Sequence, residues 1–261
     1  MKKAIIIAAI VVAVSVICTL LVLRGCPASM VGSGNLETEA YAFADFTKVE
    51  ISSAFEFEIE QSSSYSINVT ADDNIMEYVR VSQEGQTLKI GLRTITWFGP
   101  ATLRASVSMP QLSDLSVSGA SRGTISGFSS TEDLAITVSG ASRVTGDITA
   151  GNAAIDVSGA SMVTGDITAG DVAFDISGAS TIQLDGSAND MVAEVSGASR
   201  LNLEAFTVNN ADVDFSGASS GTINLDGRLD ADLSGASRLW YIGEPTMGTI
   251  DTSGASTISQ K

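Results

Sequence analysis

The chain has 261 residues, with 30 Asp and Glu against 14 Lys and Arg, a formal net charge of −16 and no histidine. Such an acidic chain lacks the basic face that binding to nucleic-acid phosphates requires, so we expect no nucleic-acid partner. The absence of histidine excludes Ser-His-Asp and Cys-His catalysis and most catalytic zinc sites. With 25 glycines against four prolines, the composition is typical of a β-rich chain with many turns, not of a disordered one.

The N-terminus begins with a short basic stretch and then runs without a charge from residue 4 to residue 23. Twenty residues are enough to cross a bilayer as a helix. The same segment also resembles a secretory signal with a charged start and an apolar middle. A retained anchor, a lipoprotein signal and a cleaved signal peptide stay open, and all three place the chain from about residue 27 onward outside the cytoplasm.

A candidate lipidation site follows the apolar run. The order Leu23-Arg24-Gly25-Cys26 resembles a bacterial lipobox, with Cys26 as the residue that would carry the lipid, although Arg24 replaces the usual small or apolar residue. The other cysteine also lies near the N-terminus, so the body has no thiolate cluster or disulfide framework. We expect residues 1–26 to form the signal or membrane anchor and residues 27–45 to form a polar linker.

Residues 46–115 form a β-rich leading segment. Apolar and polar residues alternate in several short stretches, as in strands with one solvated face. The stretches lie around residues 49–59, 65–69, 79–90 and 107–109, and the third of them predicts a hairpin at Gln83-Glu84-Gly85-Gln86. A helical turn is expected near residues 75–78. Residues 94–103, which include Trp97 and Phe98, form a loop that interrupts the alternation.

The tetrapeptide Ser-Gly-Ala-Ser occurs eight times after this segment. Its glycines are Gly119, Gly140, Gly159, Gly178, Gly197, Gly217, Gly235 and Gly254. The intervals of 18 to 21 residues are the signature of a repeat architecture. They are too short for repeats built from helix pairs, and the units hold too few leucines for leucine-rich repeats.

Each unit has the same apolar and polar columns. Apolar residues lie two and four positions before the glycine in nearly all units and four positions after it in most, which predicts that they point inward. The position between the first two holds an acid in six units: Asp156, Asp175, Glu194, Asp214, Asp232 and Asp251. The serine before the glycine is expected to point outward, with Gly-Ala as a tight corner. A third strand per unit is expected around Ile148 and Ile167.

These columns predict an all-β fold. Over residues 116–261 we expect a single-stranded parallel β-helix, or solenoid, of about 19 residues per coil, with coils stacked at about 4.8 Å. It would follow the leading segment and an N-terminal apolar helix. A right hand is expected by analogy with larger β-helices.

The chain resembles the head GIN domain family of putative autotransporter adhesins. The resemblance rests on the leading strands, the step Met109-Pro110-x-Leu112 and the repeated Ser-Gly-Ala-Ser, and it covers residues 46–261. Membership implies a β-helical, cell-surface domain of bacterial type. It brings no catalytic residues, and the loop at Trp97 has no counterpart in the family pattern.

The acidic column has two interpretations. Neighbouring like charges destabilise a sheet, so cations could bridge the column, since carboxylates bind calcium. Alternatively, the column is solvated and serves solubility. Arginines three positions after four of the glycines would neutralise the acids or form a polysaccharide groove with them: Arg122, Arg143, Arg200 and Arg238.

The leading functional hypothesis is a membrane-tethered, non-enzymatic surface module that binds in the manner of an adhesin, without a cofactor. Its partner would be a surface protein or a polysaccharide, with Trp97, Phe98, Trp240 and Tyr241 as candidate contacts. A carbohydrate-active β-helix enzyme and a self-assembling envelope protein are the alternatives. We also expect the C-terminal coil, with Trp240 and Tyr241 folded over it, to pair weakly with a second copy.

Overall fold

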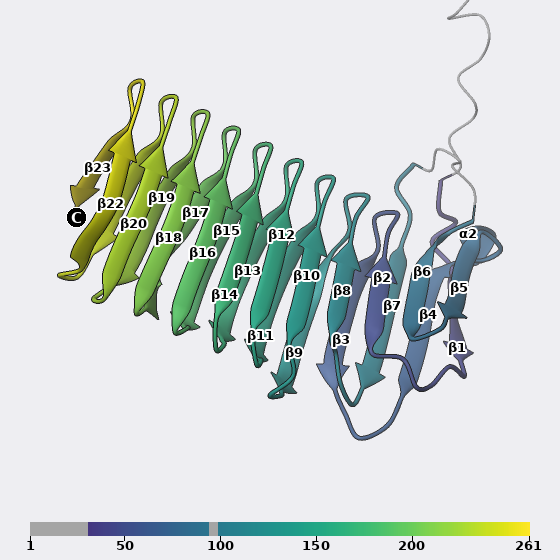
Figure 1. Cartoon of the computed structure of the whole chain (residues 1–261). Coiled ribbons are helices and arrows are strands. Elements are labelled where there is room, and N and C mark those ends of the chain that lie inside the picture. The colour runs from purple at the N-terminus through teal and green to yellow at the C-terminus, as the bar shows by residue number, and fades with distance from the viewer. Residues whose placement is uncertain (1–30, 94–98) are drawn as a thin grey trace, which may run out of the picture.

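The structure is a computed structural model that describes residues 31–93 and 99–261 (Figure 1). The apolar run, Cys26, Trp97 and Phe98 lie outside the described residues, so the expected N-terminal helix is not tested. No helix in the described ranges is long and apolar enough to cross a membrane. The strands stack into a rod with two sheets, which confirms the all-β solenoid.

The first sheet has twelve strands. In spatial order they are β1 (Leu36–Tyr41), β4 (Ser66–Asp72), β7 (Leu103–Met109), β3 (Glu56–Gln61), β9 (Arg122–Ser129), β11 (Arg143–Thr149), β13 (Met162–Thr168), β15 (Thr181–Ser187), β17 (Arg200–Val208), β19 (Ser220–Leu225), β21 (Arg238–Ile242) and β23 (Thr257–Gln260).

The second sheet has eleven strands. In spatial order they are β22 (Thr246–Thr252), β20 (Arg228–Leu233), β18 (Asn210–Phe215), β16 (Asp190–Val195), β14 (Val172–Ile176), β12 (Ala153–Val157), β10 (Leu134–Val138), β8 (Asp114–Val117), β2 (Lys48–Ile51), β6 (Thr87–Leu92) and β5 (Val79–Glu84).

Each coil gives one strand to each sheet, with the Ser-Gly-Ala-Ser corner between them. The third strand expected per unit is wrong. Ile148 and Ile167 lie within β11 and β13, whose parallel pairing runs unbroken from Val144↔Val163 to Ile148↔Ile167. The strand does not bend there, because the inward alternation that begins at Val144 continues with period two to Ile148.

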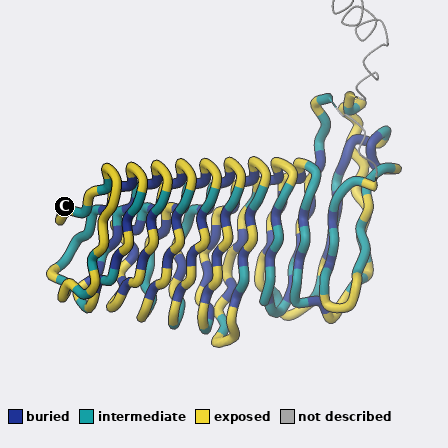
Figure 2. The backbone as a smooth tube through the Cα atoms, turned by 45° about the horizontal axis from the view of Figure 1, so that its top comes forward, coloured by how far each residue is buried: buried dark blue, intermediate teal, exposed yellow. Residues whose placement is uncertain are grey.

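The predicted inward columns form the core. Residues two and four positions before the glycines are buried in all coils but the last, and so are the apolar residues four positions after. Figure 2 shows buried backbone along the inside of the rod and a row of exposed turns along one edge. In the last coil Thr252 is exposed and Ile250 is half-buried, because no further coil covers it within the described residues.

The leading segment continues both sheets. β2 pairs in parallel with β8 and with β6, and β3 pairs in parallel with β7 and β9. The expected hairpin is confirmed as the antiparallel pair β5 and β6. The expected helical turn is present, but α2 (Asp73–Met76) begins two residues earlier than predicted.

β1 lies inside residues 27–45, which were expected to form a polar linker. Its residues LETEAY are almost all exposed, so they carry no alternation that would signal a strand. The strand exists because β4 supplies an antiparallel edge, with Thr38 and Thr70 hydroxyls 2.8 Å apart across the pair.

The buried carboxylate of Asp72 ties this end of the rod together. One oxygen accepts a hydrogen bond from the Gly34 N–H and the other from the Thr102 N–H, each at 2.7 Å. Asp72 is 2 % exposed, and a buried charge of this kind needs such donors. It therefore holds the chain before β1, the start of α2 and the chain before β7 in one place.

The corner requires glycine for two separate reasons. Gly159 has φ +79°, a conformation that favours glycine, and a Cβ atom on it would lie 2.5 Å from the carbonyl oxygen of Gly140 in the preceding coil. That oxygen accepts a hydrogen bond from the Ala160 N–H at 2.9 Å. The corner glycines thus let successive coils approach until their backbones bond.

We expect Gly159→Ala to destabilise the protein more than Gly85→Ala. Gly85 has φ +59° and nothing within 4 Å of an added Cβ, so its change costs only the strained conformation, about 1–2 kcal/mol. At position 159 the steric conflict with backbone adds to a similar strain. Urea unfolding of both variants measures the difference, and equal losses would contradict the stacking role.

Candidate functional site

The acidic column lies on the outer face of the second sheet, as predicted. Direct register pairs join Asp156 to Asp175, Asp175 to Glu194, and so on to Asp251. All six side chains are exposed. Within the described residues, no group of three or more Asp, Glu or Cys is arranged to hold a metal ion. The geometry is a row of carboxylates without a closed coordination shell.

Within this row of carboxylates, the pKa of Asp156 is shifted. Partial burial, and then the negative charge of Asp175, raise the pKa of Asp156 above its ordinary value of 3.8. Both effects disfavour the ionised form. The charge of Asp156 is therefore incompletely compensated in this structure.

The arginines do not neutralise this column, so that expectation is wrong. Arg122, Arg143, Arg200 and Arg238 each begin a strand of the first sheet and point outward. The acids point outward from the second sheet, and the buried core lies between the two faces. The physical reason is the position of the Ser-Gly-Ala-Ser corner. In each unit the corner follows the acid and precedes the arginine, and it carries the chain from the second sheet to the first.

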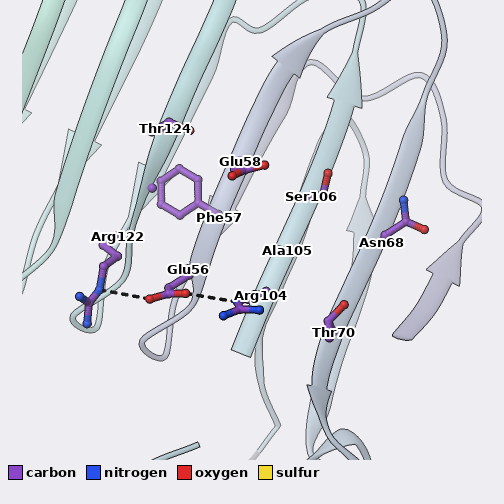
Figure 3. Close-up of a pocket in the computed structure, with 11 residues that line it drawn as sticks. Glu56, Phe57, Glu58, Asn68, Thr70, Arg104, Ala105, Ser106, Arg122 and Thr124 are labelled. Carbon is purple, nitrogen blue, oxygen red and sulfur yellow. Dashed lines mark hydrogen bonds and ion pairs between the residues drawn. The ribbon is translucent and has the colours of Figure 1, made fainter. Parts of the chain in front are cut away.

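A polar groove of about 420 Å³ crosses the first sheet near its N-terminal end (Figure 3). At one end of it lies Glu56 on β3, whose carboxylate is 3.4 Å from Nε of Arg104 on β7 and 4.0 Å from Nε of Arg122 on β9. All three side chains are exposed, so each ion pair contributes little to stability. The arrangement instead holds one guanidinium group on each side of the Glu56 carboxylate.

Neutral and acidic hydrogen-bonding groups continue the groove along the strands. Glu58 lies between Ser106 and Thr124 in the register of the three strands. Asn68 and Thr70 on β4 complete the lining, as Figure 3 shows. Hydroxyl, amide, carboxylate and guanidinium groups on one open face can bind the hydroxyl and acidic groups of a saccharide.

Arg122 is a candidate from the sequence, whereas Glu56, Glu58 and Arg104 were not expected to share a site with it. The alternation around Glu56 and Glu58 indicated an outward face. However, the strand order β4-β7-β3-β9 brings Asn68, Arg104 and Arg122 into one groove with Glu56. No local signal in the sequence specifies that order.

Of the candidate aromatic contacts, only Trp240 and Tyr241 lie in described residues. Trp240 is half-buried on the first sheet and lines a small polar hollow with Asn202 and Thr222. Tyr241 packs against the core. They do not fold over the end of the rod, because β23 pairs with β21 and covers this coil.

The second serine of each repeat is a further column that sequence reasoning missed. Seven of these serines are 0–2 % exposed: Ser121, Ser142, Ser161, Ser180, Ser199, Ser219 and Ser237. Ser121 and Ser237 each donate from Oγ to the carbonyl oxygen of the first serine of their own corner, at 2.8 Å. The second serine of the motif is thus a buried part of the corner in these seven coils. The first serines are half-buried in all coils but the last.

Comparison with protein families gives one match. The family model described as "Putative auto-transporter adhesin, head GIN domain" matches residues 45–245. No curated protein matches the chain significantly.

Solved structures of proteins from two Parabacteroides species share the fold. A protein described as a putative adhesin from Parabacteroides merdae has a TM-score of 0.82 at 20% identity, and the match covers 89% of this chain and 99% of that one. A protein from Parabacteroides distasonis described as a putative lipid binding protein has the same TM-score, identity and coverage. A second P. distasonis protein, described as a putative adhesin, has a TM-score of 0.81 at 19% identity, with 89% and 100% covered.

Replacing Asp175 with Asn is expected to lower the pKa of Asp156 toward 3.8, because it removes one of the two causes of the shift. Since the folded-state pKa is raised, this group favours the folded state at low pH, and that contribution is lost as the pH rises through the folded pKa. Carboxyl carbon chemical shifts of Asp156 across a pH series measure the change. Asp251→Asn, at the far end of the column, is the control and should leave this titration in place.

Proposed function

Because the chain belongs to the head GIN domain family of putative auto-transporter adhesins, we propose that it is a non-enzymatic, adhesin-like binding module that acts outside the cytoplasm. We further propose that the N-terminal segment tethers it to the membrane, as a retained anchor or through Cys26. A rod with two broad outer faces supports this role, since it presents a long surface for contact.

The binding surface in this proposal is the polar groove around Glu56. The observation that carries the proposal is the pair of guanidinium groups, Arg104 and Arg122, held on both sides of the Glu56 carboxylate. Guanidinium groups bind carboxylates and sulfates through two parallel hydrogen bonds. The neighbouring hydroxyl and amide groups suit sugar hydroxyls. An acidic polysaccharide is therefore the ligand class.

The surroundings of the two glutamates favour binding over hydrolysis. Glycosidases place two carboxyl groups in contrasting environments, so that one stays protonated as a general acid. Glu56 and Glu58 are both exposed on the same strand, and no buried surroundings distinguish them. A carbohydrate-active enzyme remains the alternative that the following experiment tests.

The double variant Arg104→Ala/Arg122→Ala should lose at least about tenfold in affinity for uronate-containing polysaccharides. The full chain, in a neutral detergent because of its apolar N-terminus, is incubated with acidic and neutral polysaccharides, and binding is measured by biolayer interferometry. Arg143→Ala/Arg238→Ala removes the same charge from the same sheet outside the groove and should change affinity far less.

The same samples are assayed for reducing and unsaturated sugar ends. Release of such ends by the unmodified chain, abolished in Glu56→Gln or Glu58→Gln, would establish the enzyme alternative. Equal binding by both arginine double variants would overturn the groove as the contact surface.

A second candidate function, assembly into a structural envelope layer, is favoured by the edge strands. β22 and β23 each have one neighbour in their sheet, so one side of each presents unpaired backbone groups among the described residues. Such edges can pair with another chain. Half-buried Ile250 and Ile258 lie in these strands and could add apolar contact.

If these edges pair between copies, self-association should increase with salt. The net charge of −16 makes copies repel at low ionic strength, and salt screens that repulsion. Light scattering of the full chain in detergent across a salt series measures the change. Ile258→Lys should reduce association, whereas a strict monomer at every salt concentration would remove this candidate.

A further inference from the structure

The outer face of the second sheet carries a shallow apolar groove that the proposed function does not use. Its floor consists of Ala135, Ala154, Ala173 and Val192, which are direct register neighbours on β10, β12, β14 and β16. We call these four residues the alanine trough. The groove has a volume of about 420 Å³, and Val192 is 53% exposed.

A preference of these residues for β-strands does not explain why three alanines line the floor. Alanine is depleted in strands, and an exposed position of this kind suits threonine or a charged residue. The same column is indeed polar on both sides of the trough, with Asp114 paired to Ala135 and Asp212 paired to Val192. The distinguishing property of the trough is therefore small, apolar side chains at the centre of an otherwise polar face.

Acidic side chains border the trough on both long sides. Along the strands, one border is formed by Asp156, Asp175 and Glu194, and along the turns the other is formed by Asp133, Asp171 and Asp190, with Asn152 among them. No lysine or arginine lines the groove in the part of the chain that the structure describes. The result is an apolar floor inside an anionic frame.

The turn-side border is fixed in position by the backbone. The Oδ1 atom of Asp133 accepts a hydrogen bond from the Asn152 N–H at 2.9 Å, and Oδ1 of Asp171 accepts one from the Asp190 N–H at 3.3 Å. Each carboxylate keeps a second oxygen that none of these bonds uses. These acids are therefore held in place beside the floor with some acceptor capacity left.

The strand-side border lacks compensating charge. Asp175 and Glu194 form no ion pair among the described residues, and burial and the charge of Asp175 raise the pKa of Asp156. Lys89, Lys48 and Arg228, which do form ion pairs, engage other acids. Cations brought by a partner would supply the missing compensation.

The dimensions of the frame limit the shape of that partner. The floor crosses four strands, about 14 Å at a spacing of about 4.8 Å. Each border lies two residues from the floor along the strand, which separates the borders by roughly 13 Å. An α-helix with its side chains is about 10–12 Å across and rises about 1.5 Å per residue, so roughly three turns would occupy the trough.

We propose that the alanine trough docks a basic amphipathic α-helix of a partner protein, with an apolar stripe on the alanine floor and Lys or Arg along both acidic borders. Long basic side chains lie with their stems on apolar surface and their charged ends in water, which suits a narrow floor between two acidic rows. An extended segment would direct alternate side chains away from the sheet and reach the borders less evenly. This docking is independent of the polar groove on the opposite face.

A designed helix tests the proposal directly. The probe is a fluorescently labelled peptide of about 15 residues, built from Ala, Leu and Lys so that the lysines border one apolar stripe; alone it is only marginally helical. It is titrated with the full chain in a neutral detergent, and anisotropy and circular dichroism are recorded. We expect saturable binding with a gain in helicity, weakened by salt.

Matched variants locate the contact. Ala154→Lys/Ala173→Lys places bulk and positive charge on the floor and should weaken binding at least about tenfold. Thr145→Lys/Thr164→Lys adds the same charge to the outer face of the first sheet, on the neighbouring strands β11 and β13, and should change binding less than about threefold. Circular dichroism confirms that both variants remain β-rich.

Three results would overturn the proposal. Equal weakening by the two double variants would show long-range attraction without docking. Equal binding of a peptide with the same composition but scattered lysines would show that the apolar stripe has no role. Binding without a gain in helicity would assign the trough to an extended segment. The polysaccharide assay is unaffected by each of these results, so the two proposals fail separately.

Discussion

Successive coils bond backbone to backbone at the Ser-Gly-Ala-Ser corner, and the rest of the rod depends on that close approach. The N–H of each corner alanine from the third coil onward bonds to the glycine carbonyl of the coil before, as Ala160 does to Gly140. Only a residue without Cβ permits this contact at a positive φ. Because these corners are made in the same way, each of these coils starts its next strand in register with its neighbour.

Because the register is fixed, equivalent positions of successive coils lie next to each other, and these positions hold chemically similar residues. Inside the rod this is favourable, because valine and isoleucine columns pack continuously and bury apolar surface. Outside, it places acid beside acid from Asp156 to Asp251, which is unfavourable without a partner or solvent. The two outer faces therefore present different columns: the first sheet carries the repeat arginines together with acids such as Asp147 and Asp166, and the second sheet carries the longer acidic column.

The core remains filled where the repeat departs from its pattern. Gly123 and Gly221 stand at the inward position that holds an apolar residue in most other coils. A Cβ on Gly123 would lie 2.5 Å from the ring of Phe57, and one on Gly221 would lie 2.5 Å from the ring of Phe215. In each case an aromatic ring from an adjacent strand or the facing sheet fills the missing volume, as close packing requires. The sequence of one strand does not show this compensation, because the glycine and the aromatic ring that fills its space belong to different strands.

The sequence by itself determined the repeat, the inward columns and the corner, because these depend on short-range periodicity that is repeated eight times. The hairpin of β5 and β6 was predictable because it depends on local alternation around a short turn. Tertiary structure decided the features that depend on distant strands. It placed Glu56 between Arg104 and Arg122, made β1 a strand through its pairing with β4, and put the arginines and the acidic column on opposite faces. It also turned four unremarkable small residues into one apolar floor, since residues 19 positions apart become neighbours only when coils stack.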